Sequence, residues 1–242
     1  DLDQPIPTGD AAAACRVLAD WYQEWVTREA TFVDLLPQPG QWGRASSAAG
    51  LRAPVGFDQA GDPVEAILGD SSPHALGVGP SGSGKTTFLL AWLAALAARY
   101  SPDELELLLL DFKEGVSFAQ FAPTDQRQTW LPQARLIGVN INSDREFGLA
   151  LLEHLASELV RRADAAKRHG VTKLQELRVA DPAGHWPRIV AVIDEFQFLF
   201  AAADDVAKRA VGLLEDVVRR GRSQGIHLVL ATQDTSGIKV FW

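Results

Sequence analysis

Residues 79–87, with the sequence GPSGSGKTT, constrain the fold of this chain more than any other segment. The spacing G-x-x-x-x-G-K-[ST] is matched without a mismatch by Gly79, Gly84, Lys85 and Thr86. An apolar stretch typical of a short strand, residues 74–79, leads into the segment, and a helical pattern over residues 85–100 follows it. A strand, a glycine-rich loop and a helix in this order predict an anion-binding loop within an α/β fold.

The residue types of this loop suit the phosphates of a nucleotide. Glycines let the backbone wrap closely enough for several N–H groups to point at one anion, and the following helix adds the positive end of its dipole. Lys85 is expected to reach the β- and γ-phosphates, and the hydroxyl of Thr86 to bind Mg²⁺. A chance match in a glycine- and serine-rich turn is the alternative, which the flanking strand and helix argue against. The expected phosphate-binding residues are Gly79, Pro80, Ser81, Gly82, Ser83, Gly84, Lys85, Thr86 and Thr87.

Two acidic residues, Asp194 and Glu195, follow the apolar strand pattern of residues 189–193. Ligands of open α/β sheets bind beyond the carboxyl ends of the strands, where this pair would lie. Asp194 is expected to hold Mg²⁺, through water, as part of the nucleotide site, and Glu195 to be the general base that activates water. Two solvated carboxylates that cap the next helix are the alternative. Without the phosphate loop, that alternative would be favoured.

The expected nucleotide is ATP. The chain contains neither the N-K-x-D motif that reads guanine nor an LSGG-type signature of transporter ATPases. A carboxylate base beside a metal ligand suits hydrolysis rather than nucleotide storage. The predicted activity is therefore Mg²⁺-dependent hydrolysis of ATP, with ATP and Mg²⁺ as the cofactors.

Strand and helix patterns alternate through the rest of the chain. Successive apolar residues over 105–112 and 188–196 are typical of parallel strands buried on both faces. Further strands are predicted over residues 134–141 and 226–233, and further helices over residues 143–169 and 203–222. Ser143 is the expected N-cap of the first of these helices and Gly170 its C-terminal end. This order predicts an α/β fold with a mostly parallel central sheet flanked by helices.

The N-terminal part has a different pattern, which predicts residues 1–50 as a helix and linker and residues 51–242 as the main domain. Helical spacing over residues 11–36 is followed by a segment rich in Pro, Gly, Ser and Ala, and residues 54–68 read as a short hairpin. The chain lacks methionine and stops soon after its last predicted strand. We therefore expect a piece of a longer protein, truncated at its C-terminus.

Composition limits the partners and the compartment. A net charge of -8 excludes a general electrostatic attraction to nucleic acid or anionic membrane, but it does not exclude a local basic channel. One cysteine, Cys15, excludes an intrachain disulfide and makes the cytoplasm the expected location. The longest strongly apolar run, residues 88–98, is shorter than the ~20 residues of a transmembrane helix. A membrane anchor in parts outside this chain is not excluded.

Four segments in order resemble one known family. PHALGVGPSGSGKTT, LLLLDFKEGVSF, IVAVIDEFQFLF and GRSQGIHLVLATQD are similar to the FtsK/SpoIIIE family of RecA-like motor ATPases, within the HerA–FtsK group, and the resemblance covers residues 51–237. It implies a RecA-like P-loop fold. It also implies a homo-oligomeric ring, a hexamer, that hydrolyses ATP at its subunit interfaces and pulls a polymer through its centre.

The family divides by cargo, and the resemblance leaves the cargo of this chain open. FtsK, SpoIIIE and conjugative relatives translocate double-stranded DNA, whereas EccC-type members of type VII secretion handle proteins. DFKEGVSF resembles the secretion form, but because most of the broader family is associated with DNA, double-stranded DNA is the predicted cargo by a narrow margin. The first alternative is an ATPase module of a type VII-like protein secretion system. The second is a nucleotide-gated scaffold with little turnover.

The resemblance also assigns roles to Gln233 and Arg222. Gln233 closes the last predicted strand and is expected to contact the γ-phosphate or its water; a polar strand terminus is the alternative. Arg222 follows Gly221 and is expected off the regular helix, as an arginine finger on the neighbouring subunit's nucleotide. Arg219 and Arg220 need no more than a favourable interaction with the helix dipole.

The sequence does not decide the role of three charged residues at the end of the second strand, Asp111, Lys113 and Glu114. They would serve equally well as a polar edge near the nucleotide or as a strand end that meets water.

Overall fold

The computed structural model describes residues 8–26, 31–113, 117–126, 128–138 and 144–234. The chain divides into two compact units, Asp1–Asp34 and Leu35–Trp242. In the first unit, α1 (Thr8–Val26) exposes Val17, Leu18 and Trp21. The predicted helix over residues 11–36 therefore begins earlier and ends at Val26, and residues 32–35 form a short 3-10 turn instead.

The second unit is built on a five-stranded parallel sheet, which confirms the predicted fold class. Its strand order is β3-β7-β6-β4-β5. The bounds are β3 Ala75–Val78, β4 Leu105–Asp111, β5 Ala134–Gly138, β6 Arg188–Asp194 and β7 Ile226–Thr232. All seven residues of the central strand β6 are buried, because strands pair on both of its edges and helices cover both of its faces. The carboxyl ends of these strands meet at one edge of the sheet.

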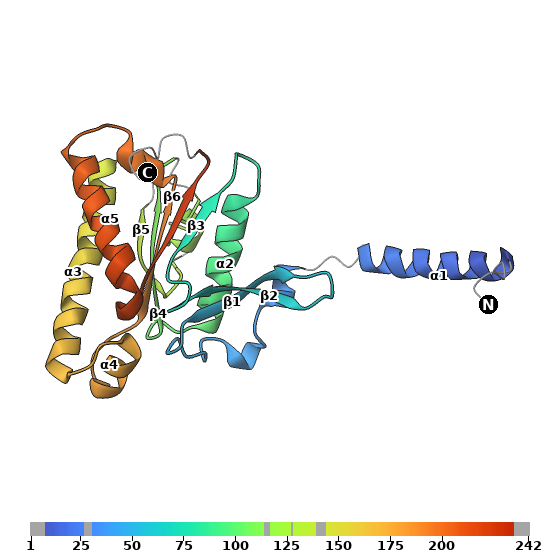
Figure 1. Cartoon of the computed structure of the whole chain (residues 1–242), viewed down its shortest axis with the longest axis horizontal. Helices are drawn as coiled ribbons and strands as arrows, with labels where there is room; N and C mark the ends of the chain where they lie inside the picture. Colours follow the sequence, from blue (N-terminus) through green and yellow to red (C-terminus); the bar gives the residue numbers. More distant parts are fainter. Residues whose placement is uncertain (1–7, 27–30, 114–116, 127, 139–143, 235–242) are drawn as a thin grey trace, which may run out of the picture. The chain divides into compact units, whose positions relative to one another are not determined.

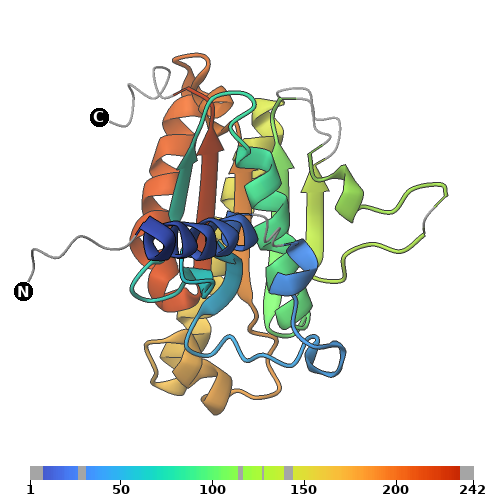
Figure 2. The same cartoon turned by 90° about the vertical axis from the view of Figure 1, so that its right-hand side faces the viewer.

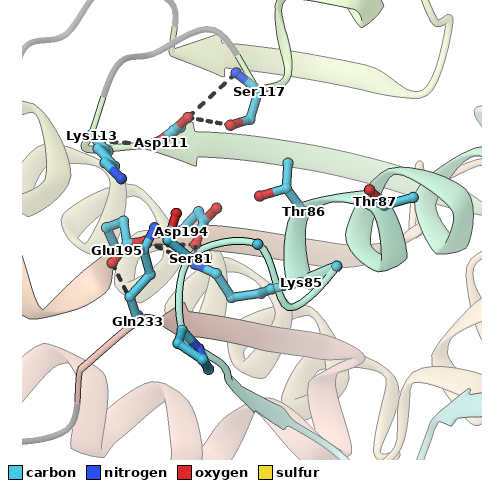
Figure 3. Close-up of a pocket in the computed structure, with 13 residues that line it drawn as sticks. Ser81, Lys85, Thr86, Thr87, Asp111, Lys113, Ser117, Asp194, Glu195 and Gln233 are labelled. Carbon is cyan, nitrogen blue, oxygen red and sulfur yellow. Dashed lines mark hydrogen bonds and ion pairs between the residues drawn. The ribbon is translucent and has the colours of Figure 1, made fainter.

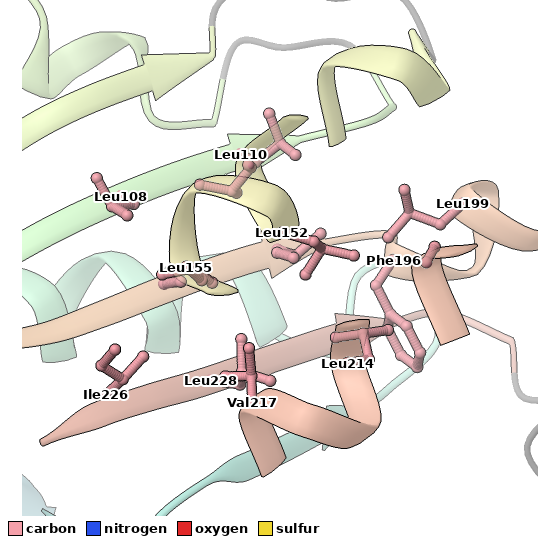
Figure 4. Close-up of a cluster of buried hydrophobic side chains, with 14 of the residues drawn as sticks. Leu108, Leu110, Leu152, Leu155, Phe196, Leu199, Leu214, Val217, Ile226 and Leu228 are labelled. Atoms are coloured by element: carbon pink, nitrogen blue, oxygen red, sulfur yellow. The ribbon is translucent and has the colours of Figure 1, made fainter. Parts of the chain in front are cut away.

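Helices cover both faces of the sheet. Figure 1 shows α2 (Lys85–Arg99) on one side and α3 (Arg145–His169) with α5 (Asp205–Gln224) on the other. Figure 2 shows α2 lying over the parallel strands. The α3–α5 side encloses one buried cluster, in which leucines of β4 and α3 pack against Leu214, Val217 and Leu228 (Figure 4). Each fully buried leucine contributes about 1.5–3 kcal/mol, so this cluster fixes both helices on the sheet.

The ends of α3 show where a sequence-based expectation was wrong. Its N-cap is Asp144, whose side chain accepts a hydrogen bond from the N–H of Phe147, rather than Ser143, which lies outside the described residues. Gly170 ends the helix in the left-handed conformation, as expected. A short helix, α4 (Leu174–Ala180), follows; it was not predicted.

The predicted hairpin is present as the antiparallel strands β1 (Leu51–Phe57) and β2 (Pro63–Leu68). Its turn is stabilised by the carboxylate of Asp58, which accepts the N–H groups of Ala60 and Asp62 at 2.9 Å each. Leu51 and Leu68 are buried in the cluster beneath α2, so the hairpin belongs to the core of the second unit.

The segment predicted as a linker is anchored to the second unit. Ser47 is buried, and its hydroxyl donates to the carboxylate of Glu104 at 2.6 Å. Arg178 donates to the same carboxylate at 2.8 Å, and Arg188 donates to the carbonyl of Ser47 at 2.6 Å. Burial alone would raise the pKa of Glu104, but the hydrogen bonds from Ser47 and the charge of Arg178 outweigh it and lower the pKa. No described helix is long and apolar enough to cross a lipid bilayer.

Candidate functional site

The glycine-rich loop connects β3 to α2 at the edge where the strands have their carboxyl ends (Figure 2). Gly82 and Gly84 have φ angles of 80° and 87°, which side chains other than glycine rarely adopt. A Cβ atom on Gly79 would lie 2.5 Å from the hydroxyl oxygen and 3.3 Å from the Cβ atom of Ser83, so the loop turns tightly at this position. Gly84 then begins α2, which directs the N-terminal end of that helix toward the loop.

Lys85 connects this loop to the two acidic residues at the end of β6. Its ammonium group donates to Asp194 Oδ1 and, at 2.9 Å, to Glu195 Oε1 (Figure 3). The three side chains are 9%, 4% and 3% exposed, respectively. The structure thus brings together residues that are 109 and 110 positions apart in the sequence. We call Asp194 and Glu195 the carboxylate pair.

Opposing effects set the charges of these groups. Burial raises the pKa of Asp194 despite its bond to Lys85. Burial also acts to raise the pKa of Glu195, but hydrogen bonds from Gln197, Lys85 and the N–H of Gln233 outweigh it and lower that pKa. For Lys85, burial acts to lower the pKa, and the carboxylate pair raises it overall. Lys85 therefore stays positive and Glu195 stays ionised near neutral pH.

The backbone of Glu195 is itself unusual. Its φ of 54° makes it the only non-glycine residue with a positive φ among the residues that the structure describes. A conformation of this kind costs on the order of 1 kcal/mol and is often found at functional sites. It turns the chain sharply between β6 and the 3-10 helix η4 (Phe196–Phe200), and the backbone N–H of Glu195 donates to Asp194 Oδ1 at 2.9 Å.

These groups line one pocket with a volume of about 370 Å³. The lining residues are Pro80, Ser81, Gly82, Gly84, Lys85, Thr86, Thr87, Asp111, Lys113, Ser117, Asp194, Glu195 and Gln233. Of the predicted loop residues, Gly79 and Ser83 support the turn without lining the pocket. Gln233 is brought to the site, and its backbone N–H donates to Glu195 at 3.2 Å.

Asp111 and Lys113, whose role the sequence did not decide, also line the pocket. Asp111 lies directly opposite Asp194 in the pairing of β4 with β6. Its carboxylate accepts the N–H of Lys113 at 2.9 Å and the hydroxyl of Ser117 at 2.6 Å, so it shapes the turn after β4 (Figure 3). Glu114 lies outside the described residues. Their position in the sequence, as charged residues at the end of a strand, was what indicated a place near the nucleotide site.

The residues present fit a magnesium–nucleotide complex. The hydroxyl of Thr86 and the carboxylate of Asp194 line the same pocket as Lys85. Within the described ranges, no three His, Cys, Asp or Glu side chains form a group that could hold a metal ion. Mg²⁺ would therefore take its remaining ligands from phosphate and water, as it commonly does.

Arg222 does not lie where the sequence placed it. Helix α5 continues through Gly221 to Gln224 and ends at Gly225, so Arg222 is an exposed residue of its last turn. Gly221 is present for packing rather than for ending the helix, because a Cβ atom there would lie 2.5 Å from the carbonyl oxygen of Ile226. This end of α5 leads into the start of β7. It therefore lies at the amino ends of the strands, whereas the pocket lies at their carboxyl ends.

Comparisons with known proteins agree on the class of this chain. A family model described as "FtsK/SpoIIIE family" matches residues 38–237. The ESX secretion system protein EccC of Thermomonospora curvata is 32% identical over an alignment of 193 residues, which covers 76% of this chain and 14% of the relative. The chain therefore spans about a seventh of that relative's length.

Solved structures share the fold. The cytoplasmic domain of the type VII secretion ATPase EccC of Thermomonospora curvata matches with a TM-score of 0.71 and 28% identity over 87% of this chain and 25% of that one. The conjugation coupling protein TcpA, solved with ATPγS, has a TM-score of 0.61 at 24% identity over 88% of this chain and 56% of that one, and shows the fold alone. The secretion alternative is thus supported better than the narrow preference for double-stranded DNA.

Proposed function

The chain belongs to the FtsK/SpoIIIE family of ATPases, and from this premise we propose that it hydrolyses ATP in a type VII-like system that moves a protein substrate. The observation that carries the proposal is the joining of the phosphate loop to the carboxylate pair through Lys85. A ligand-binding loop alone would suit a scaffold. An ionised glutamate held beside it supplies the base that hydrolysis needs.

The first step proposed is an exchange of partners by Lys85. Its ammonium group leaves the carboxylate pair and contacts the β- and γ-phosphates, while backbone N–H groups of the loop and the start of α2 bind the phosphate oxygens. Thr86 and Asp194 would hold Mg²⁺, which would neutralise part of the charge of the phosphates. The departure of Lys85 leaves Glu195 Oε1 without its donor.

The second step is attack by water on the γ-phosphorus. Glu195 accepts one proton from this water, the new P–O bond forms, and the bond to the β-phosphate oxygen breaks to leave ADP and inorganic phosphate. The ionised state of Glu195 suits this role. Gln233, which lines the same pocket, is proposed to contact the γ-phosphate or the attacking water.

Arg222 is proposed to act on a neighbouring subunit. It is exposed and does not line its own pocket, so a nucleotide that it contacts would be one bound to another copy. Its fixed charge and fork of donors match a phosphate group. Turnover would then require assembly, for which we propose a homo-oligomeric ring, with any membrane attachment through segments outside this chain.

The test measures ATP turnover of the full chain with Mg²⁺ over a series of protein concentrations. The proposal expects turnover that rises more than proportionally with concentration and that Glu195→Gln abolishes while ATP binding persists. Equal behaviour of the wild type and Glu195→Gln would identify a scaffold instead. A salt series with double-stranded DNA tests the cargo: strong stimulation at low salt that fades at high salt would favour DNA over a protein.

A further inference from the structure

The two carboxylate oxygens of Glu195 have different partners. Oε1 accepts from the ammonium group of Lys85 at 2.9 Å. Oε2 accepts from the side-chain amide of Gln197 at 2.6 Å and from the N–H of Gln233 at 3.2 Å. The donor on Oε1 is a flexible side chain with a second role in the pocket. The two donors to Oε2 are the amide of Gln197 and a backbone N–H group, and neither donates to another acceptor among the described residues.

Gln197 is held in place by the packing of η4. Its neighbours Phe196 and Leu199 are 3% and 0% exposed and contribute to the cluster on the α3–α5 side (Figure 4). The guanidinium group of Arg145 donates to the carbonyl of Leu199 at 3.0 Å and anchors the same turn to α3. Gln197 itself does not line the pocket, so it reaches the site only through Glu195.

The orientation of the Gln197 amide follows from the charge of its partner. Its Oε1 atom is buried and has no hydrogen-bond partner among the described residues, whereas its N–H group faces the carboxylate. Turning the amide over would place two acceptor oxygens at the same short distance. Buried polar atoms in proteins nearly always have partners, so the bond to Glu195 must outweigh the loss at the other end of the amide.

We propose that Gln197 is a positioning residue that holds Oε2 of Glu195 so that Oε1 is the oxygen that accepts the proton from water. The inference rests on the proposed function, since it names the working atom of the proposed base. Lys85 occupies Oε1 in the structure and releases it when it turns to phosphate. Gln197 and the N–H of Gln233 remain, and they keep the carboxylate from rotating when its other partner leaves.

The decisive variant is Gln197→Met, which keeps the length of the side chain and removes the donor. It also removes the unpartnered buried oxygen, so the fold should lose little stability. Gln175→Met on the exposed face of α4 is the matched control. We expect turnover to fall about tenfold, a fraction of the roughly 10²–10⁴-fold that a general base contributes, with unchanged affinity for ATPγS.

The pH dependence separates positioning from packing. Loss of the Gln197 donor raises the pKa of Glu195, so the acid limb of turnover against pH should move to higher pH in Gln197→Met and stay in place in Gln175→Met. Lower turnover without a shift of the acid limb would overturn the proposal. So would a loss of turnover that is fully accounted for by a lower melting temperature, and Gln197 would then have only a packing role.

A second measurement does not depend on turnover. Carbon-13 NMR of labelled glutamate carboxyl groups, with the Glu195 signal identified by its loss in Glu195→Gln, follows the titration of this group in the full chain. The proposal expects a higher pKa in Gln197→Met than in the wild type, and equal values refute it. An inactive wild type with the expected titration shift would count against hydrolysis while supporting the contact, so the two failures are distinguishable.

Discussion

Replacing Lys85 with methionine should destabilise the nucleotide-free protein as well as weaken its binding of ATP. In the structure, Lys85 is the cation that contacts both members of the carboxylate pair, whose side chains are 4% and 3% exposed. Without it, the two neighbouring carboxylates stay buried with no positive partner among the residues that the structure describes. Methionine has nearly the same length and packs in the same space, so the substitution isolates the loss of charge.

The magnitude follows from the geometry. Removing one member of a buried ion pair costs about 3–5 kcal/mol, because the other member keeps its desolvation. The pocket is open to water, and burial of the ammonium group itself is also relieved, so we expect the lower end, about 3 kcal/mol. With a urea dependence of about 1–3 kcal/mol per molar, the midpoint of unfolding should fall by at least about 1 M.

Urea unfolding at a series of pH values tests this estimate. The lowered pKa of Glu195 means that its ion pair stabilises the folded state above the ordinary carboxyl pKa and loses that effect as pH falls through the lowered value. The difference between wild type and Lys85→Met should be full at pH 7, begin to shrink near the ordinary carboxyl pKa of about 4, and vanish below the lowered pKa of Glu195. Lys208→Met, which removes an exposed pair with Asp205, is the control and should show no measurable change. Equal midpoints at pH 7 would refute the reasoning.

Three further predictions test the neighbourhood of the site. Millimolar Mg²⁺ without nucleotide should raise the melting temperature of the lysine variant but not of the wild type, because the ammonium group already occupies the place between the two carboxylates; a wild-type response would contradict this. Gly221→Ala should lower stability by about 1–3 kcal/mol through the contact with Ile226, whereas Gly212→Ala, with open space around it in the same helix, should be neutral or stabilising by thermal unfolding. Arg222→Ala should lower turnover by roughly 10³-fold or more at unchanged ATPγS affinity, with Arg220→Ala near wild type; weakened binding would remove the proposed role.

Local signals were sufficient for most of the fold and for the chemical groups of the site. Strands buried on both faces are apolar at successive positions, so β4 and β6 are visible in the sequence. The phosphate loop needs its glycines at fixed positions, and the carboxylate pair follows its strand directly. The contact of Lys85 with that pair was not predicted, because it depends on how distant segments meet.

The errors have the same physical origin. Gly221 suggested the end of a helix, yet the residue is needed where α5 passes close to the start of β7. The composition around Ser47 predicted a linker or loop and gave no sign of the bonds between its buried hydroxyl and Glu104 and Arg178. Gln197 gave no signal, since one glutamine among aromatic residues has no distinctive spacing. For Gly221 and Ser47 a tertiary contact decides the role of a locally ordinary residue, whereas Gln197 acts on Glu195, two positions before it in the chain.

The attachment of the segment around Ser47 sets the path by which a mechanical load enters the second unit. Tension applied at Leu35 reaches the hydrogen bonds of Gly43 and Ala45 to the carbonyls at the end of α2 before it reaches the hairpin. It then meets the bonds of Ser47 and Ala48 to Glu104 and Arg188, beside the starts of β4 and β6. Several bonds share this load at once. Force transmitted through the chain would therefore enter the second unit at the end of the sheet opposite the phosphate loop.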